Sequence, residues 1–228
     1  MKGLLFLLIL AVAGNSLADT SFRKSKVTLS KKIYHDYKRS FYCECDFSLQ
    51  PKLNGKGDRL TPDWKSCGYK PRKQAKRASR IEWEHVMPAH HFGQHMACWK
   101  KGGRKACKKD KAFKRMAADM HNLVPAVGEV NGDRSNYKFG IIAGEKRSYG
   151  KCDVEVDFKA KRAEPAPDIR GEIARTYSYM SDRYNIRLSK QQRKLMQAWD
   201  KQDPVSKWER TRNKRIGKVQ GNLNPYIK

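Results

Sequence analysis

The stretch Ile81-Glu82-Trp83-Glu84-His85-Val86-Met87-Pro88-Ala89 places an acid beside an imidazole in a short apolar run. Successive side chains of a strand point to opposite faces, so Glu84 and His85 share one small site only if the strand ends or bends there. A carboxylate is a hard ligand suited to Mg²⁺, and a neutral imidazole takes a proton from water near pH 7. Metal and base together are the minimum requirement for water to attack a phosphodiester. The alternative is an acid and a histidine at a strand end with no catalytic part, the ordinary case for so short a motif.

Three further histidines follow this stretch and suggest a metal cluster with His85: His90, His91 and His95. His91 and His95 have helical i, i+4 spacing, but the Glu of a His-Glu-x-x-His zinc motif is missing. We therefore interpret all three as surface or packing residues.

The 228-residue chain is long enough for one domain with a substantial core. Its start reads Met1-Lys2, then an apolar run from Leu4 to Ala13, then Ser16-Leu17-Ala18. This pattern is typical of a secretory signal and not of a membrane anchor, so we expect residues 1–18 to be a signal peptide and 19–228 to be the mature domain. Beyond it no apolar run is long enough to span a bilayer.

An even number of cysteines follows the expected signal: Cys43, Cys45, Cys67, Cys98, Cys107 and Cys152. In an oxidising compartment six cysteines predict three disulfides, with fifteen possible pairings. The pair Cys98 and Cys107, which encloses a short basic loop, is the easiest to propose. A zinc site is disfavoured, because the chain has no Cys-x-x-Cys pair and Cys43-x-Cys45 has the wrong spacing.

The formal net charge is +27, an excess that repels itself unless a polyanion neutralises it. Nucleic acid is the first candidate, and an anionic membrane surface or cell-wall polymer is the second. One basic segment, Lys70 to Arg80, is either a solvated loop or an edge that contacts phosphates. A second, Lys100 to Arg115, holds nine Lys or Arg residues against one acid.

The remaining pattern predicts a mixture of strands and helices. His121 to Ala126 reads as a second strand, residues 128 to 132 as a tight connection, and the alternating segment Cys152 to Phe158 as a further strand. Helix N-terminal signals stand at Asp110, Asp168, Ser189 and Asp203-Pro204. No internal repeat or low-complexity linker divides the chain.

Taken together, six blocks of the sequence resemble the bacterial endonuclease I family of secreted or periplasmic nucleases, within the His-Me finger (ββα-metal) superfamily. In order, they are Arg77–Val86 (RASRIEWEHV), Gly102–Lys105 (GGRK), Asp119–Leu123 (DMHNL), Gly128–Arg134 (GEVNGDR), Ala174–Tyr177 (ARTY) and Lys218–Asn222 (KVQGN). They span nearly the whole expected mature chain. The resemblance implies an α+β fold: a mostly helical single domain around a small sheet that carries a ββα-metal finger, stapled by disulfides.

The resemblance also implies roles for individual residues. Glu84 and Asn131 would bind one divalent cation, usually Mg²⁺, which Mn²⁺ or Ca²⁺ can replace in binding. His85 would be the general base, and Asn122 would hold it in the useful orientation. Arg104 would lie near the scissile phosphate. Nucleic acid is expected to contact Arg72, Lys73, Lys76, Arg77, Arg80, Lys105 and Arg134.

The function implied is Mg²⁺-dependent, non-specific endonucleolytic hydrolysis of double- and single-stranded DNA, with RNA as a secondary substrate and 5′-phosphate products. We expect a monomer without a membrane partner, in the periplasm or secreted. The alternative is a non-catalytic secreted nucleic-acid-binding protein. A membrane-active cationic protein is disfavoured, because the chain lacks one long basic amphipathic helix.

Two positions depart from the family pattern. Ala117 stands where many relatives carry a glutamate, so any contact which that glutamate makes with the active site is absent here. Arg210 stands where some relatives have one cysteine of a further pair, so three disulfides are expected instead of four.

Overall fold

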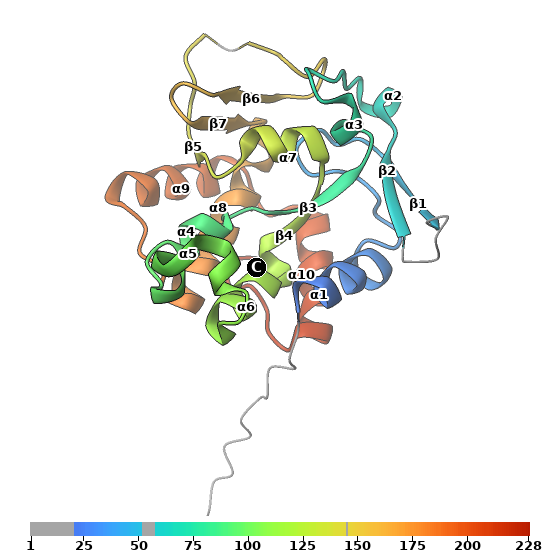
Figure 1. Cartoon of the computed structure of the whole chain (residues 1–228). Coiled ribbons are helices and arrows are strands. Elements are labelled where there is room, and N and C mark those ends of the chain that lie inside the picture. Colours follow the sequence, from blue (N-terminus) through green and yellow to red (C-terminus); the bar gives the residue numbers. More distant parts are fainter. Residues whose placement is uncertain (1–20, 52–57, 145) are drawn as a thin grey trace, which may run out of the picture.

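Two short strands that are far apart in the sequence pair near the centre of the structure (Figure 1). Strand β3, Ile81–His85, runs antiparallel to β4, Leu123–Val127, so that Glu84 lies opposite Val124. The apolar strand β4 is buried at every position and belongs to the core. The computed structural model describes residues 21–51, 58–144 and 146–228, and the expected signal peptide lies outside the described residues.

The segment between these strands is helical and ends in a 3₁₀ turn at Met120–Asn122. Its helices are α4 (Ala89–Gly93), α5 (Ala97–Cys107) and α6 (Lys111–Ala118). As predicted, the Asp110 side chain caps α6, by accepting a hydrogen bond from the backbone N–H of Phe113. The basic loop expected between Cys98 and Cys107 is instead a helix, interrupted only at Gly102 and Gly103.

Helix α7, Gly128–Arg134, begins directly where β4 ends, so the prediction of a tight connection there is wrong. A glycine is required at its first position, because a Cβ on Gly128 would lie 2.5 Å from the carbonyl oxygen of Arg77. The helix packs against both β3 and β4. Its side chains are thereby placed over the paired strands β3 and β4.

Two further sheets in the described residues lie outside the central β3–β4 pair. One is the antiparallel hairpin of β1 (Phe47–Pro51) and β2 (Asp58–Pro62). The other has the order β5-β7-β6, formed by Lys138–Phe139, Arg162–Pro165 and Val154–Asp157. The strand predicted at Cys152 to Phe158 is therefore confirmed as β6. The fold class predicted from the sequence, α+β with small sheets among many helices, is confirmed as well.

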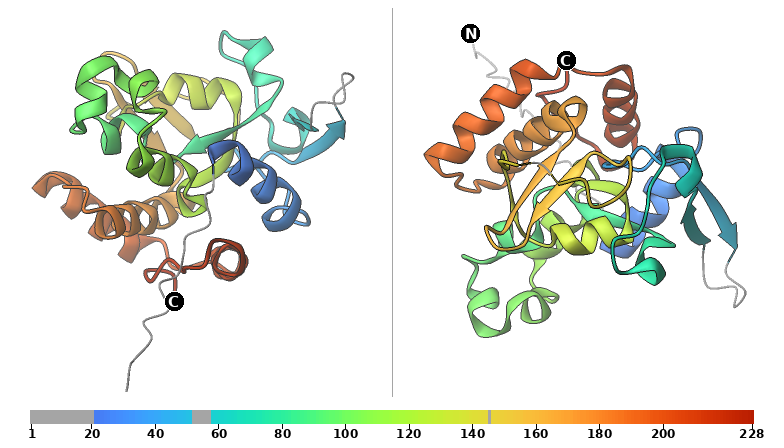
Figure 2. Two further views of the ribbon diagram at one scale, coloured as in Figure 1. Left: turned by 60° about the horizontal axis from the view of Figure 1, so that its bottom comes forward. Right: turned by 90° about the horizontal axis from the view of Figure 1, so that it is seen from above.

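The first and the last secondary-structure elements of the described chain are helices. The first, α1 (Phe22–Thr28), continues as a π-helical turn, Leu29–Ile33, and two one-turn helices follow, α2 (Trp64–Cys67) and α3 (Ala75–Ala78). After a 3₁₀ turn, Pro167–Ile169, come the long helices α8 (Arg170–Tyr184), α9 (Lys190–Gln202) and α10 (Lys207–Gln220). Figure 2 shows these three helices gathered on one side of the molecule, while the β1–β2 hairpin projects elsewhere.

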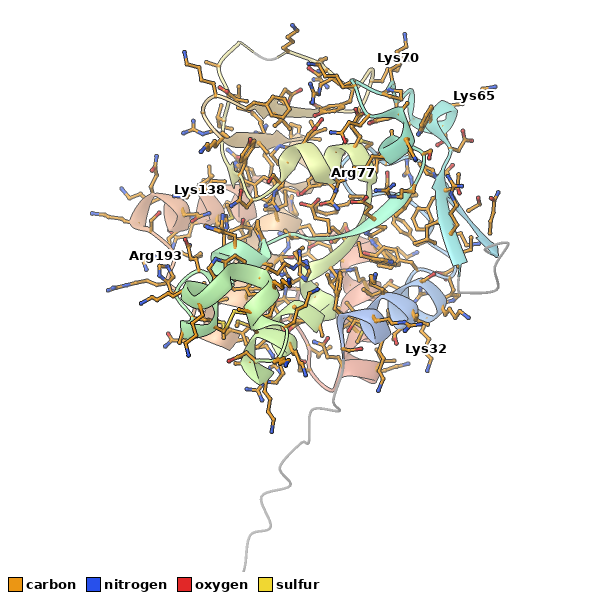
Figure 3. All side chains as sticks on the ribbon, viewed as in Figure 1. Lys32, Lys65, Lys70, Arg77, Lys138 and Arg193 are labelled. Atoms are coloured by element: carbon orange, nitrogen blue, oxygen red, sulfur yellow. A yellow bond between two sulfur atoms is a disulfide. The ribbon has the colours of Figure 1, made fainter. Side chains whose placement is uncertain are left out.

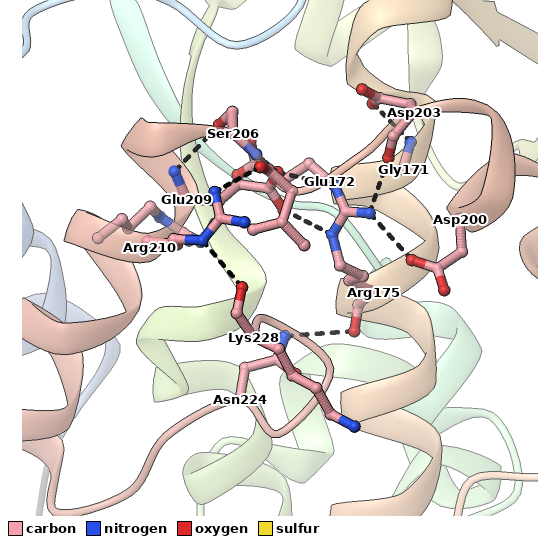
Figure 4. A network of polar contacts seen from close by, with 12 residues as sticks. Gly171, Glu172, Arg175, Asp200, Asp203, Ser206, Glu209, Arg210, Asn224 and Lys228 are labelled. Atoms are coloured by element: carbon pink, nitrogen blue, oxygen red, sulfur yellow. Dashed lines mark hydrogen bonds and ion pairs between the residues drawn. The ribbon is translucent and has the colours of Figure 1, made fainter.

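A buried ionic network joins the three C-terminal helices (Figure 4). Arg175 of α8 donates two hydrogen bonds of 2.7 Å to Glu209 of α10 and one of 2.9 Å to Asp200 of α9. Its side chain is only 1% exposed. A buried guanidinium requires such partners, so the network holds the helices in one arrangement.

The six cysteines form three disulfides, which confirms the predicted number and the Cys98–Cys107 pair. The other two join Cys43 to Cys152 and Cys45 to Cys67. Within the described ranges, no helix is both long enough and apolar enough to cross a membrane.

Candidate active site

A cleft of about 1180 Å³ runs along β3. Residues of α1, of α4 and α5, and of α7 form its other walls. Its lining brings together four of the five residues predicted to act in catalysis or metal binding: Glu84, His85, Arg104 and Asn131. Eight Lys or Arg residues line the cleft against two glutamates, so it favours an anionic ligand.

The Glu84 carboxylate is buried, with two oxygens in different surroundings. Its Oε1 accepts hydrogen bonds from the Tyr42 hydroxyl at 2.8 Å and from Nη1 of Arg134 at 2.9 Å. Its Oε2 is also buried but has no hydrogen-bond partner among the described residues. Burial raises the pKa of Glu84 to about 7, although the Arg134 charge and the Tyr42 hydroxyl act in the opposite direction. An unpartnered buried carboxylate oxygen is costly, which points to a ligand that would complete it.

The imidazole of His85 is held by one hydrogen bond and two aromatic rings. Its Nε2 lies 2.8 Å from the carbonyl oxygen of Ala117, and because a carbonyl only accepts, this nitrogen carries the proton. Nδ1 is therefore the nitrogen that can accept a proton. Phe22 stacks on the ring at 5.0 Å and Phe92 meets it edge-on at 5.9 Å. Burial lowers the pKa of His85 to about 4, so the ring is neutral at neutral pH.

Asn131 lies on α7, one turn before Arg134. Its Nδ2 donates a 2.8 Å hydrogen bond to Oε2 of Glu82, which leaves its amide oxygen available to a ligand in the cleft. Sequence reasoning missed Glu82 as a site residue. The available signal was its position two residues before Glu84 in the same strand, since residues i and i+2 of a strand share one face.

A divalent cation such as Mg²⁺ fits the donors that these residues offer. The unpartnered Oε2 of Glu84 and the amide oxygen of Asn131 are hard oxygen ligands, which Mg²⁺ prefers. Among the described residues no group of three or more His, Cys, Asp or Glu side chains could hold a metal. A cation at this site would therefore need water or a substrate phosphate for its remaining positions.

Asn122 forms its side-chain hydrogen bonds with Met87. Its Oδ1 accepts from the backbone N–H of Met87 at 2.7 Å, and its Nδ2 donates to the Met87 carbonyl at 3.0 Å. The side chain is fully buried and makes no hydrogen bond to His85. The Ala117 carbonyl, not Asn122, binds the imidazole directly, and Asn122 fixes the chain just after His85.

Arg134 also differs from its predicted place on a nucleic-acid-binding surface. Its guanidinium is 1% exposed and donates to Glu84, to the carbonyl of His85 at 3.1 Å and to the carbonyl of Val86 at 2.7 Å. With these acceptors it cannot also serve as a free phosphate contact. Its position makes it the partner that orients Glu84.

The other predicted cations fall into three groups. Arg77 and Arg80 line the cleft but pair with Glu82, at 2.8 and 2.7 Å. Arg72 pairs with Asp133 at 3.0 Å, outside the cleft lining. Exposed side chains beyond that lining are those of Lys73, Lys76 and Lys105. The α1 cations that do line the cleft were not predicted: Arg23, Lys26 and, where α1 continues as a π-helical turn, Lys31.

Comparison with known proteins identifies one family model and several similar proteins. A family model described as Endonuclease I matches residues 21–228. A periplasmic deoxyribonuclease of Aeromonas hydrophila is 53% identical, over 91% of this chain and 85% of the relative. An extracellular deoxyribonuclease of the same organism is 52% identical, over 96% of this chain and 94% of the relative. Endonuclease-1 of Buchnera aphidicola subsp. Acyrthosiphon pisum (strain APS) is 49% identical, over 91% and 80%.

Proposed function

Because this chain belongs to the Endonuclease I family and is therefore a nuclease, we propose that it cleaves DNA internally by Mg²⁺-dependent hydrolysis, with His85 as the general base. The names of the similar proteins, deoxyribonuclease and endonuclease, support DNA as the substrate. RNA is a secondary substrate in this proposal. The ββα-metal finger would be formed by β3, β4 and α7.

One observation carries the proposed mechanism: the His85 ring keeps a proton on Nε2, and Nδ1 has no hydrogen-bond partner among the described residues. The adjacent residue, Glu84, has a carboxylate oxygen that likewise lacks a partner there. Nδ1 would remove a proton from the water that attacks phosphorus. General-base catalysis of this kind contributes roughly 10²–10⁴-fold to the rate. The depressed pKa of His85 keeps the ring neutral, as a base must be.

Glu84 and Asn131 would hold the cation, which supplies positive charge at the scissile phosphate when bound. Arg134 and Tyr42 keep Glu84 in place by occupying its other oxygen. Arg104, exposed at the cleft wall, would add a fixed positive charge on the phosphate as negative charge grows there. Cleavage of the P–O3′ bond leaves a 5′-phosphate on one product.

The basic cleft would bind the phosphate backbone. Contacts to phosphate position a duplex without reading its bases, so we propose cleavage with little sequence preference. The three disulfides favour an oxidising location, and similar proteins are named periplasmic or extracellular. We propose the same location here, after removal of residues 1–18.

A plasmid-nicking assay on the mature chain tests the proposal. Supercoiled DNA should be nicked with Mg²⁺ and left intact with EDTA, and product ends should accept label from a kinase only after phosphatase treatment. His85→Ala should lower the rate by about 10²-fold or more. His35→Ala, whose side chain is 52% exposed outside the cleft, is the matched control and should cleave normally. If wild-type protein binds the plasmid but leaves it intact, the chain is a binding protein and the proposal is wrong.

A further inference from the structure

The N-terminal helix supplies a ring that covers the imidazole of His85. Phe22, the first residue of α1, lies with its ring centroid 5.0 Å from that of His85 and with the two planes only 26° apart. Phe92 closes a second side of the imidazole edge-on. Because the described residues give the imidazole one hydrogen bond, at Nε2, it depends on these rings to resist rotation about its side-chain bonds.

The end of helix α6 connects α1 to the same imidazole. The last four carbonyls of a helix have no partner within it, so they are free to bind other groups. Here the Ala117 carbonyl accepts from Nε2 of His85 at 2.8 Å, and the next one, that of Ala118, accepts from the Ser25 hydroxyl at 2.6 Å. Ser25 lies one turn after Phe22 on α1 and is buried. Two adjacent carbonyls therefore set the distance between α1 and His85.

We propose that Phe22 is a positioning residue: it keeps the His85 imidazole turned with Nε2 on the Ala117 carbonyl, so that Nδ1 stays directed at the attacking water. The inference rests on the proposed function of His85. A role as a stacking platform for a nucleobase fits the structure less well, because His85 and the Lys26 ammonium, 4.8 Å from the ring centroid, both already lie over the Phe22 ring.

Steady-state cleavage of a short duplex separates positioning from binding. Phe22→Ala should lower kcat by about 10–100-fold, the scale expected for a catalytic group misplaced by about 1 Å, with KM nearly unchanged. Phe22→Tyr should restore most of the rate, and Phe22→Leu, which fills space without a flat ring, should fall between. Lys24→Ala is the control on the same helix, because Lys24 is exposed and does not line the cleft.

A second measurement tests the stack without activity. In the NMR spectrum of the metal-free protein, the ring protons of His85 should be shifted upfield by the Phe22 ring current. That shift should persist in Phe22→Tyr and disappear in Phe22→Leu. If Phe22→Ala fails to fold, the Tyr and Leu variants still decide the question by this measurement and by kcat.

A double-variant cycle distinguishes the positioning role of Phe22 from the proposed function of His85. If Phe22 acts through His85, Phe22→Ala should have no further effect in a His85→Ala background. A rise in KM at constant kcat, or an additive loss in that background, would overturn the positioning role while leaving the function of His85 intact. Normal cleavage by His85→Ala alone would instead overturn the proposed function itself.

Discussion

At the scale of single residues, the buried pair of Glu84 and Arg134 shows how a charged side chain is held in one orientation at the site. The pair is almost fully buried, and such a pair persists only if its remaining polar atoms are satisfied. Arg134 binds two backbone carbonyls besides Glu84. In the described part of the chain, Oε2 of Glu84 and Nε of Arg134 remain without partners, and of these two atoms only the carboxylate oxygen can bind a cation. The site therefore keeps one ligand oxygen fixed and open at the expense of stability.

Asn122 permits a test at the same scale. Asn122→Ala would leave the buried N–H and carbonyl of Met87 without partners, which should lower the free energy of unfolding by about 1–3 kcal/mol or more. The nicking rate should also fall, because the chain that follows His85 loses its anchor. Urea unfolding and the plasmid assay measure the two effects. Gln197→Ala, an exposed amide on α9, is the control, and equal stability of the two variants would contradict the assignment.

At the scale of elements, helix α5 shows how a break in a helix and a disulfide together position a side chain. Its interruption at Gly102 and Gly103 lies between the two cysteines of one disulfide, directly before Arg104. Gly103 has φ +60°, in the left-handed region where a side chain is strained. The disulfide holds both ends of this bent helix, so it also determines where Arg104 meets the cleft.

Removing disulfides one at a time should separate local from global effects. In the loop-entropy model, Cys98→Ser with Cys107→Ser should cost about 3 kcal/mol of stability, and Cys43→Ser with Cys152→Ser about 5 kcal/mol. The Cys98/Cys107 variant should nevertheless lose more activity for each kcal/mol of lost stability than the Cys43/Cys152 variant, because the Cys98–Cys107 disulfide encloses the segment with Arg104. Thermal unfolding and nicking at a temperature where both variants remain folded provide the comparison. Full activity of the Cys98/Cys107 variant would show that the disulfide does not position Arg104.

Charge acts at the scale of the whole molecule. The chain carries +27, and eight of the Lys and Arg residues that the structure describes line the cleft. Figure 3 shows others, such as Lys65, Lys70 and Arg193, directed outward on different sides. Cations that touch phosphate release counterions on binding, whereas distant ones contribute mainly to the general field. The salt dependence of binding can therefore locate the DNA.

Arg23→Gln should reduce the slope of log affinity against log salt concentration by about 1, because Arg23 lines the cleft and would contact one phosphate. The matched variant Arg193→Gln removes an exposed arginine of α9 and should leave the slope unchanged. Fluorescence anisotropy with a short duplex in EDTA measures binding without cleavage. Equal changes in the two variants would place the DNA outside the cleft.

Stability should fall in acid because of buried neutral histidines. Burial lowers the pKa of His121 from 6.5 to about 4, so the unfolded chain binds more protons than the folded one between these values. As pH falls through this window, His121 alone should remove on the order of 3 kcal/mol of stability. His121→Gln can still donate to the carbonyl of Asn222 and should show a smaller loss between pH 7 and 4 in urea titrations. An unchanged pH dependence would assign the acid sensitivity to other groups.

Local signals predicted the elements that depend on nearby residues. The caps at Asp110 and Ser189 and the alternating strand β6 were identified correctly, because each depends on contacts a few residues apart. The start predicted at Asp203-Pro204 was wrong. Asp203 instead ends α9, while Ser206 and Glu209 form the capping box that begins α10.

The sequence by itself determined the composition of this protein and the identity of its reactive groups: an acid–imidazole pair, six cysteines, a large positive charge and the blocks of one nuclease family. Only the tertiary structure decided their partners. Arg134 is buried against Glu84, Asn122 binds Met87 and Phe22 covers His85, across sequence separations of 50, 35 and 63 residues. The physical reason is that burial and hydrogen-bond satisfaction are set by elements packed from distant parts of the chain, which local periodicity and spacing do not encode.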